Sequence, residues 1–135
     1  MPFQIVKSKE ARKLETVEIF GNPVPKIESF DDFPFEARTE AQDLFAQWQN
    51  KTYDVYGVAI RLMCIATQLN PRPKDRYTYD RLKTEMRDAD PEFLKAWQAQ
   101  VIEWASQVFI ALGEEAERQA REPDPNARMA AESSS

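Results

Sequence analysis

Apolar positions with the period of a helix dominate the second half of the chain. Between residues 90 and 112 they recur at steps of three and four, which places them on one face of an α-helix. They are Phe93, Trp97, Val101, Trp104, Ala105, Val108 and Leu112. Asp90 and Pro91 form a typical helix start, with an N-cap followed by a first-turn proline. We therefore predict a long helix over 90–112, about 33 Å at 1.5 Å per residue, against which the rest of the chain packs.

Three shorter helices are predicted before the long one. Residues 34–49 carry apolar side chains on one face and charged side chains on the other, the pattern of a surface helix. Residues 52–69 are apolar around almost the whole circumference, which is typical of a buried helix. We therefore expect 52–69 at the centre of the fold, between 34–49 and the long helix. A third, shorter helix is predicted at 79–89, after a proline-containing loop.

Two glycines and a polar C-terminal part bear on where these helices end. Gly57 lies inside the buried segment, and we interpret it as a point where another backbone comes close. Gly113 either caps the long helix or lies inside a helix that continues through 114–121. In the second case we expect 114–121 to protrude into solvent, because nearly all its residues are polar. Residues 122–135, rich in proline and small residues, are expected to be disordered.

The N-terminal part shows the alternation of β-strands instead. Residues 16–20 alternate apolar and polar side chains, and residues 24–28 form a second short run. Gly-Asn-Pro at 21–23 is favourable turn chemistry, so we predict a β-hairpin with its turn there. Pro25 should lie on a sheet edge, because proline cannot donate a hydrogen bond to a neighbouring strand. Residues 3–6 are predicted to form a further short strand.

Together these elements predict a mainly α fold with a minor β part. We expect a small bundle of three to four helices with an N-terminal β-hairpin. The predicted organisation is an N-terminal segment at 1–33, a helical domain at 34–113, and a polar helix extension with a disordered tail at 114–135. A chain of 135 residues is long enough to bury one core without metal or disulfide cross-links.

Composition narrows the chemistry that the protein can perform. The chain has no histidine and a single cysteine, Cys64. Histidine is the commonest general base and metal ligand, and no glycine-rich phosphate loop or calcium-loop spacing occurs, so we predict no enzyme activity and expect no cofactor and no metal. Cys64 lies in the apolar run of the buried helix, where an inert thiol is expected.

Charge and hydropathy narrow the partners and the location. The net charge of −5 argues against a broad electrostatic grip on nucleic acid or anionic lipid. No apolar run approaches the roughly 20 residues of a membrane span, and no N-terminal run resembles a signal peptide. We therefore expect no membrane association and a cytoplasmic location, which is the host cytoplasm if the protein is viral.

Aromatic side chains are the main candidates for contacts with a partner protein. Phe30, Phe33 and Phe35 cluster in a tight corner between the hairpin and the first helix. This corner either closes the end of the core or presents an exposed aromatic anchor. Trp48, Trp97 and Trp104 lie on apolar helix faces and belong either to the core or to an interface. We take all six as candidate partner-binding residues and leave self-association open.

A basic and aromatic stretch is the candidate for nucleic-acid contact. Its basic residues are Arg72, Lys74, Arg76, Arg81, Lys83 and Arg87, with Tyr77 and Tyr79 between them. Arg72, Lys74, Arg76 and Tyr77 are the candidate contact residues. Basic residues interleaved with aromatic ones are a nucleic-acid pattern. Acidic residues at positions 75, 80, 85 and 88 lie in the same stretch, however, and favour ion pairing on a helix surface. We therefore expect nucleic acid not to be the main partner.

In layout the chain resembles the tail assembly chaperones of long-tailed bacteriophages. The matching parts are the hairpin TVEIF-GNP-VPKIE, the corner FDDFPFEA, the helices up to Leu112 and the polar end from Glu114. The resemblance implies a non-catalytic protein that binds the tape-measure or tail-tube protein during virion assembly. It carries over no individual functional residue.

Two functional hypotheses follow from the residues. The first is a non-catalytic assembly or adaptor protein, with the tail assembly chaperone as its most specific version. The alternative is a small regulator or inhibitor that acts on a nucleic-acid machine, either an anti-defence protein or a DNA-binding factor. Salt-dependent binding to nucleic acid would distinguish the second from the first.

Overall fold

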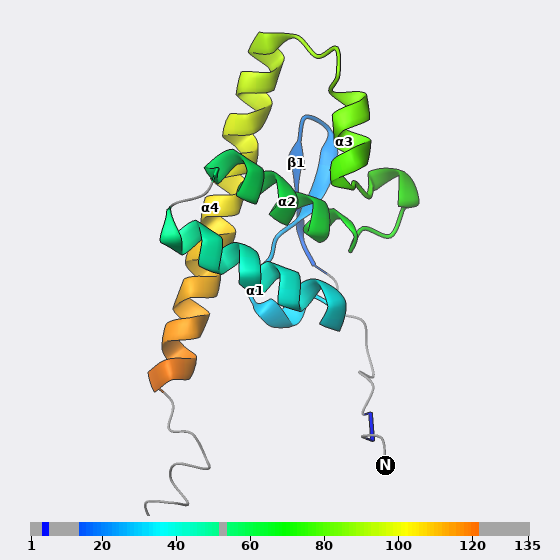
Figure 1. Cartoon of the computed structure of the whole chain (residues 1–135). Helices are drawn as coiled ribbons and strands as arrows, with labels where there is room; N and C mark the ends of the chain where they lie inside the picture. The colour runs from blue at the N-terminus through cyan, green and yellow to red at the C-terminus, as the bar shows by residue number, and fades with distance from the viewer. Residues whose placement is uncertain (1–3, 6–13, 52–53, 122–135) are drawn as a thin grey trace, which may run out of the picture.

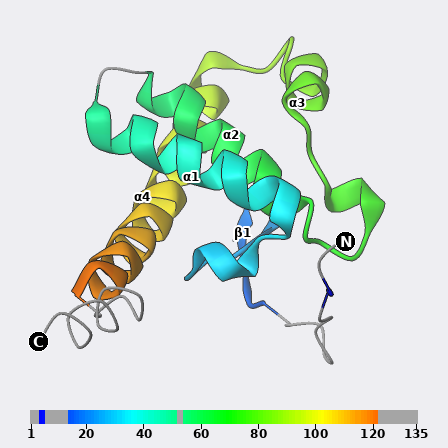
Figure 2. The same cartoon turned by 60° about the horizontal axis from the view of Figure 1, so that its bottom comes forward.

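The protein is mainly α-helical with one N-terminal β-hairpin. The computed structural model describes residues 4–5, 14–51 and 54–121. In chain order its elements are β1 (Thr16–Ile19), β2 (Asn22–Pro25), the 3-10 helix η1 (Phe30–Asp32), α1 (Phe35–Asn50), α2 (Val55–Thr67), the 3-10 helix η2 (Pro73–Asp75), α3 (Tyr79–Glu85) and α4 (Pro91–Arg121). The hairpin lies between α3 and α4, and α1 packs beside α2 (Figures 1 and 2). The predicted fold class is confirmed.

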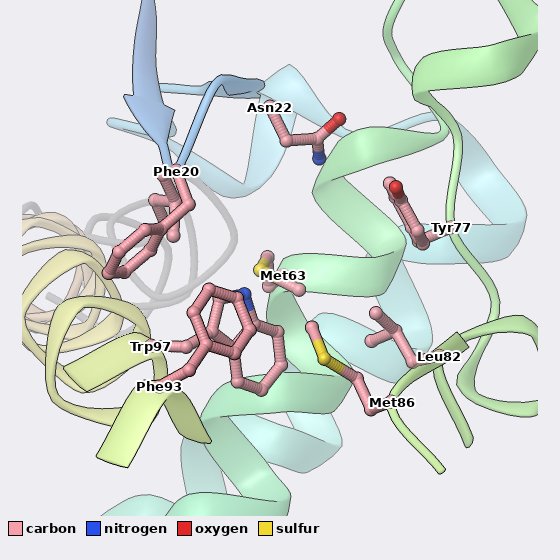
Figure 3. A pocket seen from close by; sticks show the side chains of 9 residues that line it. Phe20, Asn22, Met63, Tyr77, Leu82, Met86, Phe93 and Trp97 are labelled. Carbon is pink, nitrogen blue, oxygen red and sulfur yellow. The ribbon is translucent and has the colours of Figure 1, made fainter. Parts of the chain in front are cut away.

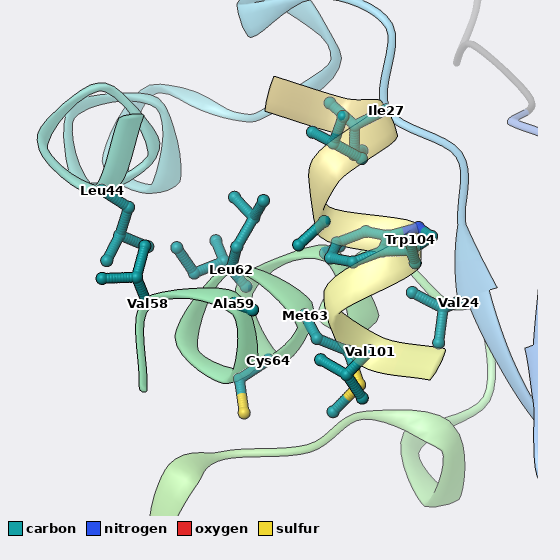
Figure 4. Packing of buried hydrophobic residues seen from close by; sticks show 14 of the residues in the cluster. Val24, Ile27, Leu44, Val58, Ala59, Leu62, Met63, Cys64, Val101 and Trp104 are labelled. Atoms are coloured by element: carbon teal, nitrogen blue, oxygen red, sulfur yellow. The ribbon is translucent and has the colours of Figure 1, made fainter. Parts of the chain in front are cut away.

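Helix α2 is the centre of the core, as its all-round apolar pattern predicts. It is buried along most of its length and packs against α1, α4 and β2. Figure 4 shows side chains from all of these elements meeting around Leu62, with Leu44 from α1, Val24 from β2 and Val101 from α4. Leu62 and Val101 are completely inaccessible to solvent. The order of elements therefore places the most apolar segment where every other layer can cover it.

The hairpin turn lies at residues 20–21, one position before the predicted turn. Ile19 pairs with Asn22, so the turn consists of Phe20 and Gly21, with φ of 48° and 82°. Two consecutive positive φ angles match the right-handed twist of a two-residue hairpin. Asn22 and Pro23, which were predicted to form the turn, belong to β2. The side chains explain this register, because it turns Ile19 and Val24 together into the core.

The hairpin shares the core of the helices. Ile19, Val24 and Ile27 are almost fully buried within the same apolar cluster as the helices. The indole Nε1–H of Trp104 donates to the carbonyl of Pro25 at 3.2 Å, which satisfies the polar group of an otherwise buried ring. Residues 14–33 are thus an integral layer of the fold, because two strands alone bury too little apolar surface to be stable.

The corner between the hairpin and α1 is built by a capping box. The Ser29 hydroxyl accepts from the amide of Asp31, and the Asp32 carboxylate accepts from the amides of Glu28 and Ser29 at 2.9 and 3.1 Å. The Asp32 carboxylate thus bonds at the start of η1, while the N-cap position of α1 is Pro34, which has no side-chain cap.

Helix α4 begins as predicted and continues past Gly113. The Asp90 carboxylate accepts from the amides of Glu92 and Phe93 at 3.1 and 3.2 Å, which confirms its role as N-cap. The helix passes through Gly113 to Arg121, so Gly113 is not a cap. A Cβ added at Gly113 would lie 3.7 Å from the Phe45 ring, an ordinary contact.

The first turn of the polar extension is docked onto the protein. Glu115 is only 7% exposed, and its carboxylate accepts from the Ser29 hydroxyl at 2.9 Å and from the Phe30 amide at 3.0 Å. The prediction that the whole of 114–121 protrudes is therefore wrong for Glu115. The side chains from position 117 onward are exposed, as predicted.

Three further details differ from the sequence prediction: the end of the third helix, the surroundings of Gly57 and the strand at 3–6. The third helix ends at Glu85 instead of 89, because Met86 leaves the helical region with φ of −91° and ψ of 2°. The three described atoms nearest to a Cβ added at Gly57 all belong to the Asp54 side chain, with a carboxylate oxygen at 3.2 Å, so the expected close backbone is not among them. Of the predicted strand at 3–6, Gln4 and Ile5 are described and belong to no strand, while the rest lies outside the described residues, as does the tail at 122–135.

Candidate protein-binding site

An apolar pocket opens between the tip of the hairpin, α3 and the first turns of α4. Its volume is about 190 Å³. It is lined by Ile19, Phe20, Asn22, Met63, Tyr77, Leu82, Met86, Phe93 and Trp97. Figure 3 shows side chains from the hairpin, α2, α3 and α4 converging on this space. We call it the tip pocket.

Phe20 lies at the rim of the tip pocket, and its backbone conformation is unfavourable for a residue other than glycine. Its φ of 48° lies in the left-handed region, where a non-glycine residue costs about 1–3 kcal/mol. Asn and Gly are the residues that this turn position favours. The Phe20 side chain is 49% exposed, so burial recovers only part of that cost. The sequence therefore places a bulky aromatic ring in a strained and exposed position.

Phe93 completes the aromatic rim. Its ring packs edge-on against Phe20 with the ring centroids 5.1 Å apart, and it is 36% exposed. Asp90 fixes its position by capping the first turn of α4, since its carboxylate accepts from the Phe93 amide. The two rings thus come from segments far apart in the chain and meet at the surface.

The floor and wall of the tip pocket are adaptable. Met63 and Trp97 are nearly buried and form the floor, whereas Met86 is half-buried at the end of α3. Methionine has an unbranched and polarizable side chain that can follow the shape of different apolar guests. A pocket rimmed by two rings and lined by two methionines is suited to accept apolar side chains of more than one shape.

Half of the sequence-predicted partner residues are core residues. Phe33, Trp97 and Trp104 are 1%, 7% and 6% exposed, so none of these rings is an exposed anchor. The expectation that they bind a partner as exposed aromatic residues is corrected for these three. Trp97 still reaches the candidate site from below, as part of the pocket floor.

The other three predicted aromatic residues do not form one surface. Phe30 is half-buried against Phe45, and Trp48 stacks on Phe109 with the ring centroids 4.6 Å apart. Phe35 alone is strongly exposed, at 83%. The corner is therefore not a cluster of exposed rings, because Phe33 is buried, Phe30 is half-buried and Phe35 is exposed.

The arginines of the predicted nucleic-acid stretch serve the fold. Arg72 pairs with Asp75 at 2.9 Å, and the Arg76 guanidinium donates to the carbonyls of Asn70 and Pro71 at 2.8 and 3.2 Å. The Arg81 guanidinium lies over the Tyr77 ring, with its central carbon 4.0 Å from the ring centroid. Lys74 and Arg72 are both exposed. Arg72 and Arg76 bond within the loop before α3, and Arg72 does so from an exposed position.

Two groups near the centre have raised pKa values. Burial, with a smaller contribution from the Glu40 carboxylate, raises the pKa of the Cys64 thiol to about 12. Burial, followed by the charge of Glu85, raises the pKa of the Tyr77 hydroxyl. A thiol that stays protonated is a poor nucleophile, which agrees with the expected inert role of Cys64.

The described residues contain no metal site, and a wider groove lies elsewhere on the surface. Among the described residues, no group of three or more Cys, Asp or Glu side chains could hold a metal ion, and no helix is long and apolar enough to cross a membrane. A wider groove of about 490 Å³ runs between α1 and α2. Its lining includes the charged side chains of Glu36, Glu40 and Arg61.

Neither rim residue was among the predicted site residues. Phe93 appears in the sequence only as one position of the long apolar stripe, and Phe20 as the end of a strand. The available signal was a phenylalanine directly before the glycine of a hairpin turn. No protein-family model, curated protein or solved structure matches the chain. A function is therefore inferred from the residues and their geometry.

Proposed function

We propose that the protein is a non-catalytic assembly or adaptor protein that binds apolar side chains of a partner protein in the tip pocket. The observation that carries the proposal is Phe20, an exposed aromatic ring held at a positive φ beside Phe93. A phage tail assembly chaperone, acting on a tape-measure or tail protein, is the most specific form of this proposal.

The energetics of Phe20 support binding as its role. Folding alone would favour asparagine or glycine at this turn position, since either relieves the backbone strain. The contact with Phe93 offsets about 0.5–1.5 kcal/mol of the strain. A second contact, with a partner that covers both rings, would use the apolar surface that folding leaves exposed.

The size of the tip pocket supports a side chain as the guest. Small-molecule sites usually enclose roughly 300–1,000 Å³, and the tip pocket has about 190 Å³. One large apolar side chain, presented by a helix or loop of another protein, is a guest of suitable size. Aromatic rims with well-packed floors are typical of interface hot spots.

The substitution Phe20→Asn tests the proposal. It relieves about 1–3 kcal/mol of strain and removes about 0.5–1.5 kcal/mol of ring contact, so the melting temperature should change by only a few degrees. Binding should fall sharply, because half of the aromatic rim is lost. The measurement is affinity capture of tagged wild-type and variant protein from the native host, with quantitative mass spectrometry of the captured proteins.

Phe35→Ser is the matched control. It removes a phenylalanine that is more exposed than Phe20 and lies outside the tip pocket, so captured partners should be unchanged. If Phe20→Asn keeps every partner while Phe35→Ser loses them, the corner and not the tip pocket is the binding site. Capture of nucleic acid with a steep salt dependence would instead favour a regulator of a nucleic-acid machine.

A further inference from the structure

The two edges of the β-hairpin differ in their free backbone groups. In an antiparallel pair, alternate residues bond to the partner strand and the others point their backbone groups outward. The Lys26 amide donates to the Glu15 carbonyl at 2.8 Å, which fixes the alternation. Thr16 and Glu18 on β1, and Pro23 and Pro25 on β2, are therefore the outward-pointing residues.

The outer edge of β2 is closed to further pairing. Both of its outward residues are prolines, which have no amide hydrogen to donate. The two carbonyls are already bonded: Pro23 accepts from the Asn70 side chain at 2.8 Å and Pro25 from the Trp104 indole at 3.2 Å. No donor or free acceptor remains at these two positions.

The outer edge of β1 is open. Thr16, Val17 and Glu18 are exposed. Within residues 14–51 and 54–121, nothing bonds to the outward amides and carbonyls of Thr16 and Glu18. An unpaired strand edge is a template for an added strand, and proteins usually block such edges with proline or cover them. Among the residues that the structure describes, two prolines block one edge and none blocks the other.

A groove runs beside the open edge, between β1 and α4. It consists of two adjoining pockets of about 260 Å³ each, which share Val17, Trp104 and Gln107. Three carboxylates line it, from Glu18, Glu28 and Glu103. Lys26 is the cation of the lining, and it pairs with Glu15 at 3.7 Å. The lining therefore combines apolar side chains with three carboxylates and one ammonium group.

We propose that the β1 edge binds an extended segment of another protein in which apolar and basic residues alternate. The segment adds a third strand by bonding to the outward groups of Thr16 and Glu18. Its apolar side chains lie over Val17 and Trp104, and its lysines or arginines face Glu18 and Glu103. The alternation follows from the pleat, which turns successive side chains to opposite sides of a strand.

A second copy of the chain does not have this chemistry. Pairing β1 with β1 of another copy would bring the same carboxylates together, in a chain whose net charge is already −5. The proposed surface is also separate from the tip pocket, since it requires neither Phe20 nor Phe93. The two proposals can therefore fail independently.

Amide hydrogen exchange measured by NMR tests the proposal directly. The probe is a short peptide of alternating valine and lysine, added to the full chain. In the free protein the amides of Thr16 and Glu18 should exchange rapidly, whereas those of Val17 and Ile19 should be protected by the hairpin. With peptide at about ten times its dissociation constant, exchange at Thr16 and Glu18 should slow about tenfold.

Two peptide controls separate strand addition from charge attraction. A peptide of the same sequence, N-methylated at alternate residues, cannot form the main-chain bonds and should bind at least about tenfold more weakly. A valine–glutamate peptide should not bind. Equal affinity of the methylated peptide, or unchanged exchange at Thr16 and Glu18 under saturation, would overturn the proposal.

Protein variants complete the test. Glu18→Pro removes an outward amide and carboxylate at the position that faces Pro23, and should weaken binding at least about tenfold. Glu103→Lys, on the α4 surface, should weaken it roughly threefold without touching the hairpin. Phe20→Asn should leave peptide binding unchanged, which keeps this result distinct from the tip-pocket test. A dimer in sedimentation, with Thr16 and Glu18 protected in the free protein, would show that a second copy occupies the edge and would contradict the proposal.

Discussion

At the scale of single residues, backbone and side-chain preferences conflict at Phe20 and agree at most other turn and cap positions. Asp90 and Ser29 occupy cap positions that suit their side chains. Phe20 occupies a turn position that suits asparagine or glycine. Conflicts of this kind are concentrated at functional sites. Phe20 is the clearest residue-level indication of function in the described structure.

Cys64 makes a prediction about alkaline pH. Its pKa is raised from 9.0 to about 12 in the folded protein, so the protonated thiol stabilises the fold. That stabilisation is fully present below pH 9 and is lost as the pH rises from 9 toward 12. Between pH 9 and 10 the wild-type free energy of unfolding should fall by about 1 kcal/mol more than that of Cys64→Ala, measured by urea denaturation. Parallel pH profiles of the two proteins would contradict the assigned pKa.

At the scale of elements, the sequence predicts the positions of the helices well. It predicts poorly which side chains of different elements come into contact. The helices follow from local periodicity, so α1, α2 and α4 lie within a few residues of their predicted starts. The tip pocket depends on the hairpin register, which a one-residue shift of the turn changes for every side chain. Gly-Asn-Pro gave a strong local turn signal, but burial of Ile19 and Val24 decides the register. The rim could therefore not be predicted.

The end of α4 shows the same limit. Local sequence leaves Gly113 open as cap or interior residue. The bond that holds the next turn joins Glu115 to Phe30, which lies 85 positions away. No local pattern contains that information, since the partner of Glu115 is a backbone amide.

Gly113→Ala should stabilise the protein. Glycine inside a helix costs about 1 kcal/mol relative to alanine, and the added Cβ would make only an ordinary contact with Phe45 at 3.7 Å. The free energy of unfolding in urea should rise by about 1 kcal/mol. Gly57→Ala is the control: its Cβ would lie 3.2 Å from the Asp54 carboxylate, so a smaller gain or a loss is expected. A large destabilisation by Gly113→Ala would show that α1 and α4 pack more closely than described.

At the scale of the whole molecule, a few long-range polar bonds fix how the layers meet. Trp104 joins α4 to β2, Asn70 joins the end of α2 to β2, and Glu115 joins α4 to the corner. Each satisfies a buried group that packing alone would leave unpaired. The apolar core supplies most of the stability, and these bonds select one arrangement of it.

Glu115→Ala tests the link between α4 and the corner. It leaves the Ser29 hydroxyl and the Phe30 amide without their acceptor, so unfolding should become easier by about 2–4 kcal/mol. Glu117→Ala, two residues later, removes only an exposed pair with Arg121 and should change stability by less than about 0.5 kcal/mol. Chemical denaturation of both variants measures the difference. Equal effects would mean that the docked turn contributes nothing.

The bond between Trp104 and Pro25 also sets an order of events during synthesis. Trp104 follows Pro25 by 79 positions. At 5–20 residues per second, the ribosome needs roughly 4–16 s to supply it. Throughout that interval the nascent hairpin has neither α4 over its apolar side nor an indole on its last carbonyl. The two prolines of β2 act without this delay. As soon as they are incorporated, they prevent another nascent chain from pairing with the outer edge of β2.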